Sequence, residues 1–364
     1  MTEFLASRIR SNNEIKGFTI KKDKIKLTMY ADDTTAFVAD ENSAKILFLE
    51  IDNFRKVSGL KINMEKTEGL WMGSNVHFQH KPFGIKWPTA PIKALGIYFS
   101  YNTKAAENAN YDDKIKKLER LLHWWKSRGL SLMGRVLIVK TLGLSQFSFL
   151  ASVLHIPEDV IQKVNTLIYQ YIWKGKRDKI KRDIMIQDFQ NGGYRMVDLK
   201  MIVESAQLDW IKRFLDNNSA DWKTLMVEFC KKEDLRVFFQ ANFDELEIPR
   251  EIPQYYLDAI RAWRNVKYDL ITESLDLEQQ LIWYNKQIKI MQKSVYNQRL
   301  FSCGLWVLSD RYENGNLIPF KTWIRRGAFP VDIMVWMGIV NAVPQYIKNM
   351  IKIKNDKEKL CFNT

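Results

Sequence analysis

The sequence is poor in the residues that build disulfide frameworks and zinc sites. Its 364 residues include three cysteines and four histidines. Cys230, Cys303 and Cys361 are far apart and odd in number, which excludes a disulfide framework and a CxxC zinc site. His77 and His80 lie three positions apart without a third candidate ligand nearby, so we expect no metal site there. Glycine-rich phosphate-binding motifs of the GxGxxG and GxxxxGK(S/T) types are also missing.

Long hydrophobic runs are missing as well. The longest stretch without a charged residue, 141–157, has 17 residues and includes three serines, a glutamine, a histidine and a proline. It is too short and too polar to span a membrane, so we expect no membrane partner. The N-terminus has no basic segment followed by an apolar one. We therefore expect a protein that is not secreted but intracellular, in the nucleus or the cytoplasm.

What the sequence does contain is typical of ordinary globular domains. Hydrophobic residues make up 46% and charged residues 27% of the chain, a balance that excludes disorder, collagen and coiled-coil arrays. The length leaves room for two or three domains.

Positive charge is in excess and is concentrated in one segment. The chain has 56 Lys and Arg against 42 Asp and Glu, a net charge of +14. Residues 111–182 contain 15 basic and 6 acidic residues, and six of these cations fall within the nine positions 174–182. Such a run is either a solvated loop or a surface that contacts phosphates and releases counterions. Most of the aromatic residues nearby are interpreted as helix core: Trp124, Trp125, Tyr169, Tyr171 and Trp173.

Alternating apolar and polar residues predict a β-hairpin near the N-terminus. Residues 1–12 have the pattern of the end of a helix, whereas Ile25–Tyr30 and Thr34–Ala39 have the pattern of strands. The turn between the strands places Asp32 and Asp33 at the tip of the hairpin. Two adjacent carboxylates repel each other unless water or a cation screens them, although Asp is also common in ordinary turns.

An amphipathic helix is predicted after the hairpin. Apolar residues recur at helical spacing over 44–57, Asn42 or Ser43 is expected to cap the start, and Gly59 is expected to end the helix. Leu60–Met64 alternates again and predicts a short strand, so residues 18–73 have a β-β-α-β pattern.

The pattern becomes helical from about Asp112. The first helix is expected to end near Gly129, the second begins at Ser131, and the third has Pro157 in its first turn.

The remaining residues, 183–364, are predicted to be mainly helical but less regular. Turns are expected at Gly192–Gly193 and at 313–315. Asp188 and Asp198, beside the first of these turns, are interpreted as helix caps or ion-pair partners.

Five segments in this order resemble those of the reverse transcriptases of LINE-type non-LTR retrotransposons. Tyr30-Ala31-Asp32-Asp33 resembles motif C of the family, and 58–66, which ends in Asn-x-x-Lys, resembles motif D. Leu95-Gly96-Ile97 resembles the primer grip, 125–135 the thumb signature, and 192–198 the segment that follows the thumb. The similarity is continuous over about residues 1–215 and looser to about residue 350.

The resemblance implies two-metal nucleotidyl transfer at the tip of the hairpin. Asp32 would be a Mg²⁺ ligand and Asp33 the supporting carboxylate, with Mg²⁺ as the cofactor. Ala31 would let the primer end approach, and Tyr30 would lie beside it. Lys66 would face the triphosphate and assist the leaving group, although a solvated lysine after a strand is the simpler interpretation.

The resemblance also implies contacts with nucleic acid. The partners would be an RNA template, a DNA primer and deoxynucleoside triphosphates. Leu95 and Gly96 would contact the primer, and Lys126, Arg128 and Arg135 would face the duplex groove. The cations of the run 174–182 would reach the flanking backbone: Lys174, Lys176, Arg177, Lys179, Lys181 and Arg182.

Taken together, these patterns predict an α+β fold class with three parts. Residues 1–100 would be the C-terminal part of a reverse-transcriptase palm (a β-hairpin plus helix and strand), 111–182 a helical thumb, and 183–364 a mostly helical region after the thumb. The implied function is RNA-directed DNA synthesis.

A second metal-binding Asp is expected on an earlier strand of such a palm, and only Glu3, Glu14 and Asp23 precede Tyr30 as acids. We therefore expect the chain alone not to polymerise. The alternatives are a non-catalytic nucleic-acid-binding module that retains the basic thumb, and a helical protein–protein scaffold.

Overall fold

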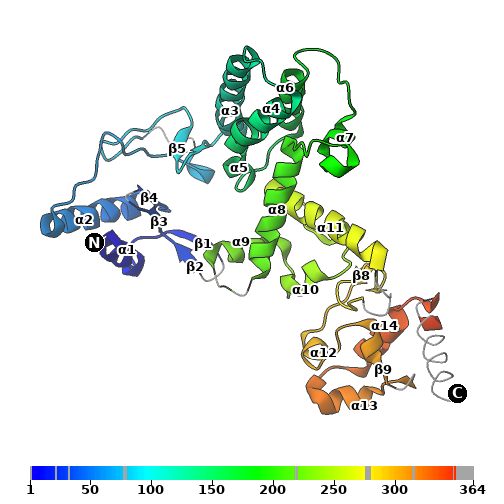
Figure 1. Ribbon diagram of the computed structural model, residues 1–364. Helices are drawn as coiled ribbons and strands as arrows, with labels where there is room; N and C mark the ends of the chain where they lie inside the picture. Colours follow the sequence, from blue (N-terminus) through cyan, green and yellow to red (C-terminus); the bar gives the residue numbers. More distant parts are fainter. Residues whose placement is uncertain are drawn as a thin grey trace. The chain divides into compact units, whose positions relative to one another are not determined.

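The chain forms two compact units, residues 1–206 and 207–364. Figure 1 shows a computed structural model of the chain. It describes residues 2–20, 23–31, 33–76, 80–216, 218, 220–274, 280–313, 316–346 and 348–349.

The N-terminal part of the first unit has two β-hairpins between two helices. Its elements are α1 (Thr2–Ser11), β1 (Phe18–Ile20), β2 (Asp23–Ile25), β3 (Leu27–Tyr30), β4 (Asp33–Ala36) and α2 (Glu41–Ser58). β1 pairs with β2 and β3 pairs with β4, both antiparallel. The predicted helix and the predicted hairpin are confirmed, but with other strand bounds. Lys26 interrupts the first predicted strand, and the second spans Asp33–Ala36 instead of Thr34–Ala39. α1, α2 and β3 enclose a small core of Ala6, Ile9, Ile15, Leu27 and Leu47.

Of the two predicted ends of α2, the C-terminal one is right and the N-terminal one is wrong. The predicted cap at Asn42 or Ser43 is wrong, because Asp40 is the N-cap and its carboxylate accepts the Ser43 N–H at 2.7 Å. This hydrogen bond lowers the pKa of Asp40, and a carboxylate is also favoured at a helix N-terminus. Gly59 ends the helix as predicted, with a left-handed φ of +73°.

The predicted strand at Leu60–Met64 is wrong, because this segment is coil that leads into a turn. Its three apolar side chains, Leu60, Ile62 and Met64, are exposed. A strand needs a hydrogen-bonded partner, and the described residues supply none for this segment. Further along the chain, before β5, Trp71 stacks on Trp87 with ring centroids 4.5 Å apart.

A third hairpin leads into a bundle of helices. The hairpin follows the short η1 (Gly73–Asn75) and consists of β5 (Ile92–Ala94) and β6 (Ile97–Phe99). The bundle consists of α3 (Thr103–Lys126), α4 (Leu132–Ile138), the π-helix η2 (Val139–Leu144), α5 (Ser145–Ala151) and α6 (Glu158–Ile172). α3 packs against α5 and α6, and α4 packs against α6. Ser131 caps α4 and Pro157 immediately precedes α6, so both predicted helix starts are confirmed.

The first bundle helix begins earlier than predicted. α3 starts at Thr103, where the Asn102 side chain accepts the Ala105 N–H at 3.1 Å. Residues 103–110 carry little apolar periodicity, so the pattern of the sequence reveals only the later part of α3.

The segment after α6 packs on the same bundle up to residue 206. It contains α7 (Arg182–Ile186), η3 (Phe189–Asn191) and the start of α8 (Leu199–Leu215). Met185, Met196, Leu199 and Val203 belong to the core that also contains Leu118, Phe147 and Ile168. The sequence analysis had grouped this segment with the C-terminal region, since a short apolar segment does not reveal which core it joins.

The predicted turn at Gly192–Gly193 is confirmed, and its sequence has a steric reason. Gly192 has a φ of +75°, and a Cβ on Gly193 would lie 1.9 Å from the Gln187 carbonyl oxygen. The two acids beside the turn also have the roles predicted for them. Asp188 pairs with Arg195 at 2.5 Å, and Asp198 accepts the Met201 N–H at the start of α8.

The second unit is mainly helical, as predicted, with short two-stranded ribbons. After the end of α8 it contains α9 (Asp221–Cys230), α10 (Leu235–Gln240), η4 (Glu245–Glu247), α11 (Gln254–Ser274), β7 (Lys289–Ile290), β8 (Lys293–Ser294), α12 (Gln298–Ser302), η6 (Leu308–Arg311), β9 (Tyr312–Glu313), β10 (Asn316–Leu317), α13 (Phe320–Trp323), η7 (Ile324–Ala328) and α14 (Ile333–Ala342). Its core is rich in aromatic side chains, with Phe238, Trp283 and Trp323 fully buried. Of the turn predicted at 313–315, Asn314 and Gly315 lie outside the described residues. Across the described parts of both units, the helices are too short or too polar to cross a membrane.

Candidate functional site

The β3–β4 hairpin has a two-residue loop at its tip. Tyr30 pairs with Asp33 across the ladder, so the turn is tight, and Ala31 is the residue of this turn that the structure describes. Ala31 has a left-handed φ of +55°, as the two-residue turns of tight hairpins require. For a residue with a Cβ this conformation costs about 1 kcal/mol. Backbone strain of this kind is common at active sites and ligand-binding sites.

Two of the predicted site residues at this tip are exposed side by side. Tyr30 is 71% exposed, and Asp33, at the start of β4, is also exposed. Asp32, the predicted metal ligand, lies outside the described residues. The structure therefore brings Tyr30, Ala31 and Asp33 together at the tip.

A buried lysine ties the base of this hairpin to α1. Lys26 is only 6% exposed, and its ammonium group donates to the carbonyls of Arg10 at 2.8 Å and Asn12 at 2.5 Å, with Ile9 at 3.4 Å. These are carbonyls at the C-terminal end of α1, where a cation is favoured. Burial, together with neighbouring Lys24, lowers the pKa of Lys26. Sequence reasoning missed this residue, because an alternating strand pattern does not show where a lysine will point.

The described residues at the tip do not amount to a two-metal site by themselves. A Mg²⁺ pair needs several hard oxygen ligands, and Asp33 is the single carboxylate of the tip that is described. Nowhere in the described ranges do three or more His, Cys, Asp or Glu side chains gather as metal ligands would. Of the two predicted histidines, His77 lies outside these ranges, and His80 is 3.7 Å from Glu41.

Lys66 lies in a turn that Asn63 organises. The Asn63 carbonyl accepts the N–H groups of Lys66 and Thr67, and the Asn63 side chain also accepts the Lys66 N–H at 3.2 Å. The Asn-x-x-Lys spacing is therefore the spacing of a side-chain-capped turn. Lys66 itself is exposed.

The β5–β6 hairpin repeats the tight geometry of the β3–β4 hairpin. Ala94 pairs with Ile97, which leaves Leu95 and Gly96 as the loop, with φ values of +48° and +85°. Leu95 is 47% exposed, and a Cβ on Gly96 would lie 3.3 Å from the Phe149 ring of α5. The tip of this hairpin therefore lies against the helical bundle.

One buried side chain fixes that hairpin to α3. Asn110 is 6% exposed; it accepts the Tyr98 N–H at 2.9 Å and donates to the Tyr98 carbonyl at 2.9 Å. It also donates to the Ala106 carbonyl at 2.8 Å. Both backbone groups of Tyr98 thus bond to a helix side chain instead of to β5. The sequence analysis missed Asn110, because the helical pattern that it found begins only at about Asp112, whereas α3 begins at Thr103.

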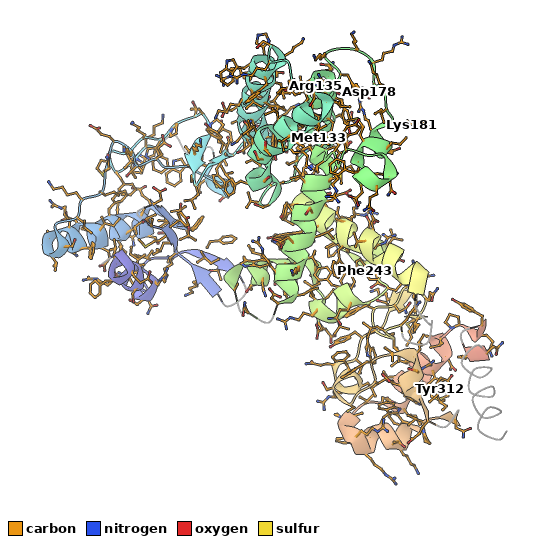
Figure 2. The ribbon with its side chains drawn as sticks, in the orientation of Figure 1. Met133, Arg135, Asp178, Lys181, Phe243 and Tyr312 are labelled. Carbon is orange, nitrogen blue, oxygen red and sulfur yellow. The ribbon has the colours of Figure 1, made fainter. Side chains whose placement is uncertain are left out.

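The three cations predicted to face a duplex groove are not equivalent. Lys126 and Arg128 are exposed at the end of α3. Arg135 is half-buried and donates to the Leu130 carbonyl at 3.2 Å, so its guanidinium closes the turn between α3 and α4. Its Nε atom is buried and has no hydrogen-bond partner in the described structure. Figure 2 labels Arg135 together with Met133 on α4.

The cationic run begins where α6 ends in two left-handed residues. Lys174 and Gly175 have φ values of +54° and +78°, and the Gly175 N–H bonds to the Gln170 carbonyl at 2.7 Å. The run then continues as an exposed loop that leads to α7. Figure 2 labels Asp178 and Lys181 of this loop. We name this segment, residues 174–181, the cationic loop.

Arg182 differs from the cations of the cationic loop. Its guanidinium pairs with Asp178 at 2.9 Å and lies over the Tyr169 ring, 4.2 Å from the centroid. Tyr169 is buried, and burial, with Asp198 nearby, raises its pKa to about 12. Arg182 therefore has a structural role in the described structure. The other five cations are exposed and have no ion-pair partner there: Lys174, Lys176, Arg177, Lys179 and Lys181.

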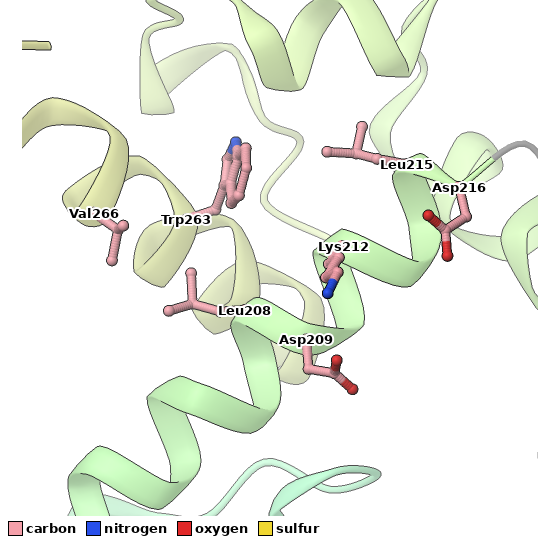
Figure 3. Close-up of a pocket in the computed structure, with 7 residues that line it drawn as sticks. All are labelled: Leu208, Asp209, Lys212, Leu215, Asp216, Trp263 and Val266. Carbon is pink, nitrogen blue, oxygen red and sulfur yellow. The ribbon is translucent and has the colours of Figure 1, made fainter. Parts of the chain in front are cut away.

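An open pocket lies in the second unit between α8 and α11 (Figure 3). Its volume is about 500 Å³. It is lined by Leu208, Asp209, Lys212, Leu215, Asp216, Trp263 and Val266. Its Asp209 is paired with Arg213 at 2.5 Å, and the Trp263 Nε1 donates to the Phe239 carbonyl. Lys212 and Asp216 are the other charged residues of the lining.

The first unit thus combines two tight hairpins with a basic helical bundle. The chain is 26% identical over 337 residues to the Transposon TX1 uncharacterized 149 kDa protein of Xenopus laevis. The alignment covers 86% of this chain and 25% of that protein, so the chain spans about a quarter of the length of this relative. No protein-family model matches the chain. The chain is accordingly related to a protein of a transposon.

Proposed function

We propose that the chain is a palm-and-thumb portion of a retrotransposon reverse transcriptase, and that its own contribution to RNA-directed DNA synthesis is to hold a template–primer duplex. The observation that carries the proposal is the β3–β4 hairpin. It places Tyr30 and Asp33 at an exposed tip within a Tyr-Ala-Asp-Asp sequence. The similarity to a transposon protein over 86% of the chain supports the same class.

The order of the elements supports this proposal. The Tyr-Ala-Asp-Asp hairpin precedes an amphipathic helix, a second tight hairpin with Leu95 and Gly96 at its tip, and then the bundle. A primer end needs a rigid support beside the chemistry, and a hairpin fixed to a helix through Asn110 supplies rigidity.

The surface charge supports contact with phosphates. Five exposed cations of the cationic loop and the exposed Lys126 and Arg128 belong to the same unit. Cations without an acidic partner on the protein keep their full charge for a polyanion. Such contacts position a duplex without reading its sequence, and they are strongly salt-dependent.

A salt titration tests the binding half of the proposal. The probe is a fluorescein-labelled RNA–DNA hybrid, and fluorescence anisotropy gives the affinity at several salt concentrations. We expect the wild-type chain to bind, and the replacement of all five free loop cations by Gln to weaken binding equally for different sequences. Each lost phosphate contact lowers the slope of log K against log salt by about 0.9 for B-form DNA, with a somewhat different value for a hybrid. Arg182 is kept, because it packs on Tyr169.

The matched control removes the same charge from the second unit. Lys212, Arg250, Lys293, Lys321 and Arg325 are exposed and are replaced by Gln. If the two five-fold variants lose the same affinity, only net charge matters and the cationic loop is not the binding surface. If the loop variant and the wild type have superimposable curves, the loop is a solvated feature and the assignment is wrong.

The second candidate function is nucleic-acid binding without catalysis. It is favoured by the tip of the β3–β4 hairpin, where Asp33 is the one described carboxylate. Primer extension by the pure chain with Mg²⁺ or Mn²⁺ separates the two candidates. We expect no extension by this chain alone. Incorporation that is lost in Asp32→Asn or Asp33→Asn would show instead that the chain forms a working catalytic site.

A further inference from the structure

The last turn of α3 carries an aromatic and cationic cluster. Trp124 and Trp125 meet edge to face, with ring centroids 6.0 Å apart and planes at 81°. The guanidinium carbon of Arg128 lies 4.5 Å from the centroid of Trp124 and 4.6 Å from that of Trp125. The arginine thus contacts both rings, a favourable arrangement for a cation beside π-systems.

Trp124 is not a core residue, although the sequence analysis interpreted most of the aromatic residues near the cationic segment as helix core. Its exposed fraction is 63%. Leu122, which fills the core, is on the opposite side of α3, since residues two apart on a helix are separated by about 200°. Tyr169, Tyr171 and Trp173 are buried as expected, so Trp124 is the exception. An indole this exposed contributes little to folding.

The charges on the Trp124 side of α3 are mainly positive. Lys117 and Arg120 lie seven and four residues before Trp124, on the same side of the helix. Lys117 is paired with Asp113, whereas Arg120 and Arg128 have no acidic partner in the described structure. Glu119 lies on another side of the helix. A ligand that stacks on Trp124 therefore also meets cations.

We propose that Trp124, supported by Arg128, is a stacking platform for an unpaired base of a single-stranded nucleic acid. The guanidinium holds one face of the indole, and the base stacks on the exposed remainder of the ring. A phosphate beside that base reaches Arg120, which lies one turn before Trp124 on the same side of the helix. Stacking of this kind is tolerant of sequence, because every base has a π-face.

This inference deepens the proposed function, on which it rests, by adding single strands to the duplex already assigned to the cationic loop. The unpaired cations beside Trp124 favour a nucleic-acid ligand over a protein partner. Trp and Arg are also common at protein interfaces, but a flat phosphate-bearing strand is the ligand that an exposed ring beside unpaired cations favours.

The test compares two labelled strands that carry the same phosphates. One is a 15-nucleotide oligouridylate, and the other is an abasic strand of equal length. We expect Trp124→Leu to weaken oligouridylate binding about 5- to 150-fold, the range of a lost base-stacking contact. Binding of the abasic strand and the slope against salt should not change. Trp124→Phe should retain part of the affinity, because it keeps a ring.

Trp306→Leu is the matched control, since Trp306 is a half-exposed indole of the second unit. Its binding to both strands should equal that of the wild type, and circular dichroism and thermal melting check the fold of each variant. Equal affinity of wild type and Trp124→Leu for oligouridylate would overturn the platform and leave a protein contact as the use of Trp124. The proposed function survives that result if the RNA–DNA hybrid still binds through the cationic loop. If the wild type binds no nucleic acid at low salt, the proposed function and the platform both fail.

Discussion

Replacing Asn110 by alanine should loosen the β5–β6 hairpin without unfolding the bundle. The substitution removes three hydrogen bonds, two to Tyr98 and one to the Ala106 carbonyl. The Tyr98 N–H and carbonyl then lose their partner in a half-buried place. Each net hydrogen bond is worth about 1 kcal/mol, and each polar group left without a partner costs about 1–3 kcal/mol. We expect a local loss of about 2–3 kcal/mol in the opening free energy of the hairpin.

Hydrogen exchange followed by mass spectrometry is the right assay, because a chain of two units is not a two-state system. A loss of 2–3 kcal/mol accelerates exchange about 30- to 150-fold in peptides that cover 92–99. Peptides that cover α6 should exchange at the wild-type rate. We also expect weaker binding of the RNA–DNA hybrid, because the hairpin no longer has a fixed position.

Asn108 is the matched control, since it is an exposed Asn on the same helix. Asn108→Ala should be neutral or slightly stabilising, because Ala has the higher helix propensity. If Asn110→Ala leaves exchange over 92–99 unchanged, or changes it no more than Asn108→Ala, the fixing role of Asn110 is refuted.

Three further predictions concern other parts of the chain. Gly193→Ala should destabilise the first unit by about 3 kcal/mol, because the new Cβ would collide with the Gln187 carbonyl, and hydrogen exchange in peptides that cover 184–196, compared with Gly192→Ala, measures it. Lys26→Met should accelerate exchange in peptides of α1 but not of α6, and an unchanged α1 would remove the lysine from its capping role. A hydrogen bond from Lys289 and, to a smaller extent, one from the Leu246 N–H lower the pKa of Asp244. The ionised Asp244 therefore stabilises the second unit fully above its unfolded pKa near 3.8, and this stabilisation is lost as the pH falls through the lower pKa of the folded state. Asp244→Asn should flatten this acid dependence of the second unit, followed by tryptophan fluorescence, and an unaltered acid profile would contradict the assignment.

Local rules acting on the sequence determined much of the first unit. The alternation before and after Ala31 was sufficient to predict a hairpin, because strand periodicity and turn chemistry act over a few residues. The end of α2 at Gly59 and the starts at Ser131 and Pro157 follow from capping, which is equally local. Gly192 and Gly193 showed their turn in the same way.

Contacts between distant residues were decided only by the tertiary structure. Leu60–Met64 alternates like a strand but has no strand partner among the described residues. Lys26, which the alternation placed in a strand, lies between β2 and β3, and its amine reaches the end of α1. Among the basic residues, Arg135 and Arg182 have the same composition signal as their neighbours. A hydrogen bond to the Leu130 carbonyl gives Arg135 a structural role, and packing on Tyr169 does so for Arg182, while the cationic loop stays exposed. The sequence alone determines how many charges the segment carries. Which of them find a partner within the protein, and which stay exposed, depends on which chain segments pack together in the fold.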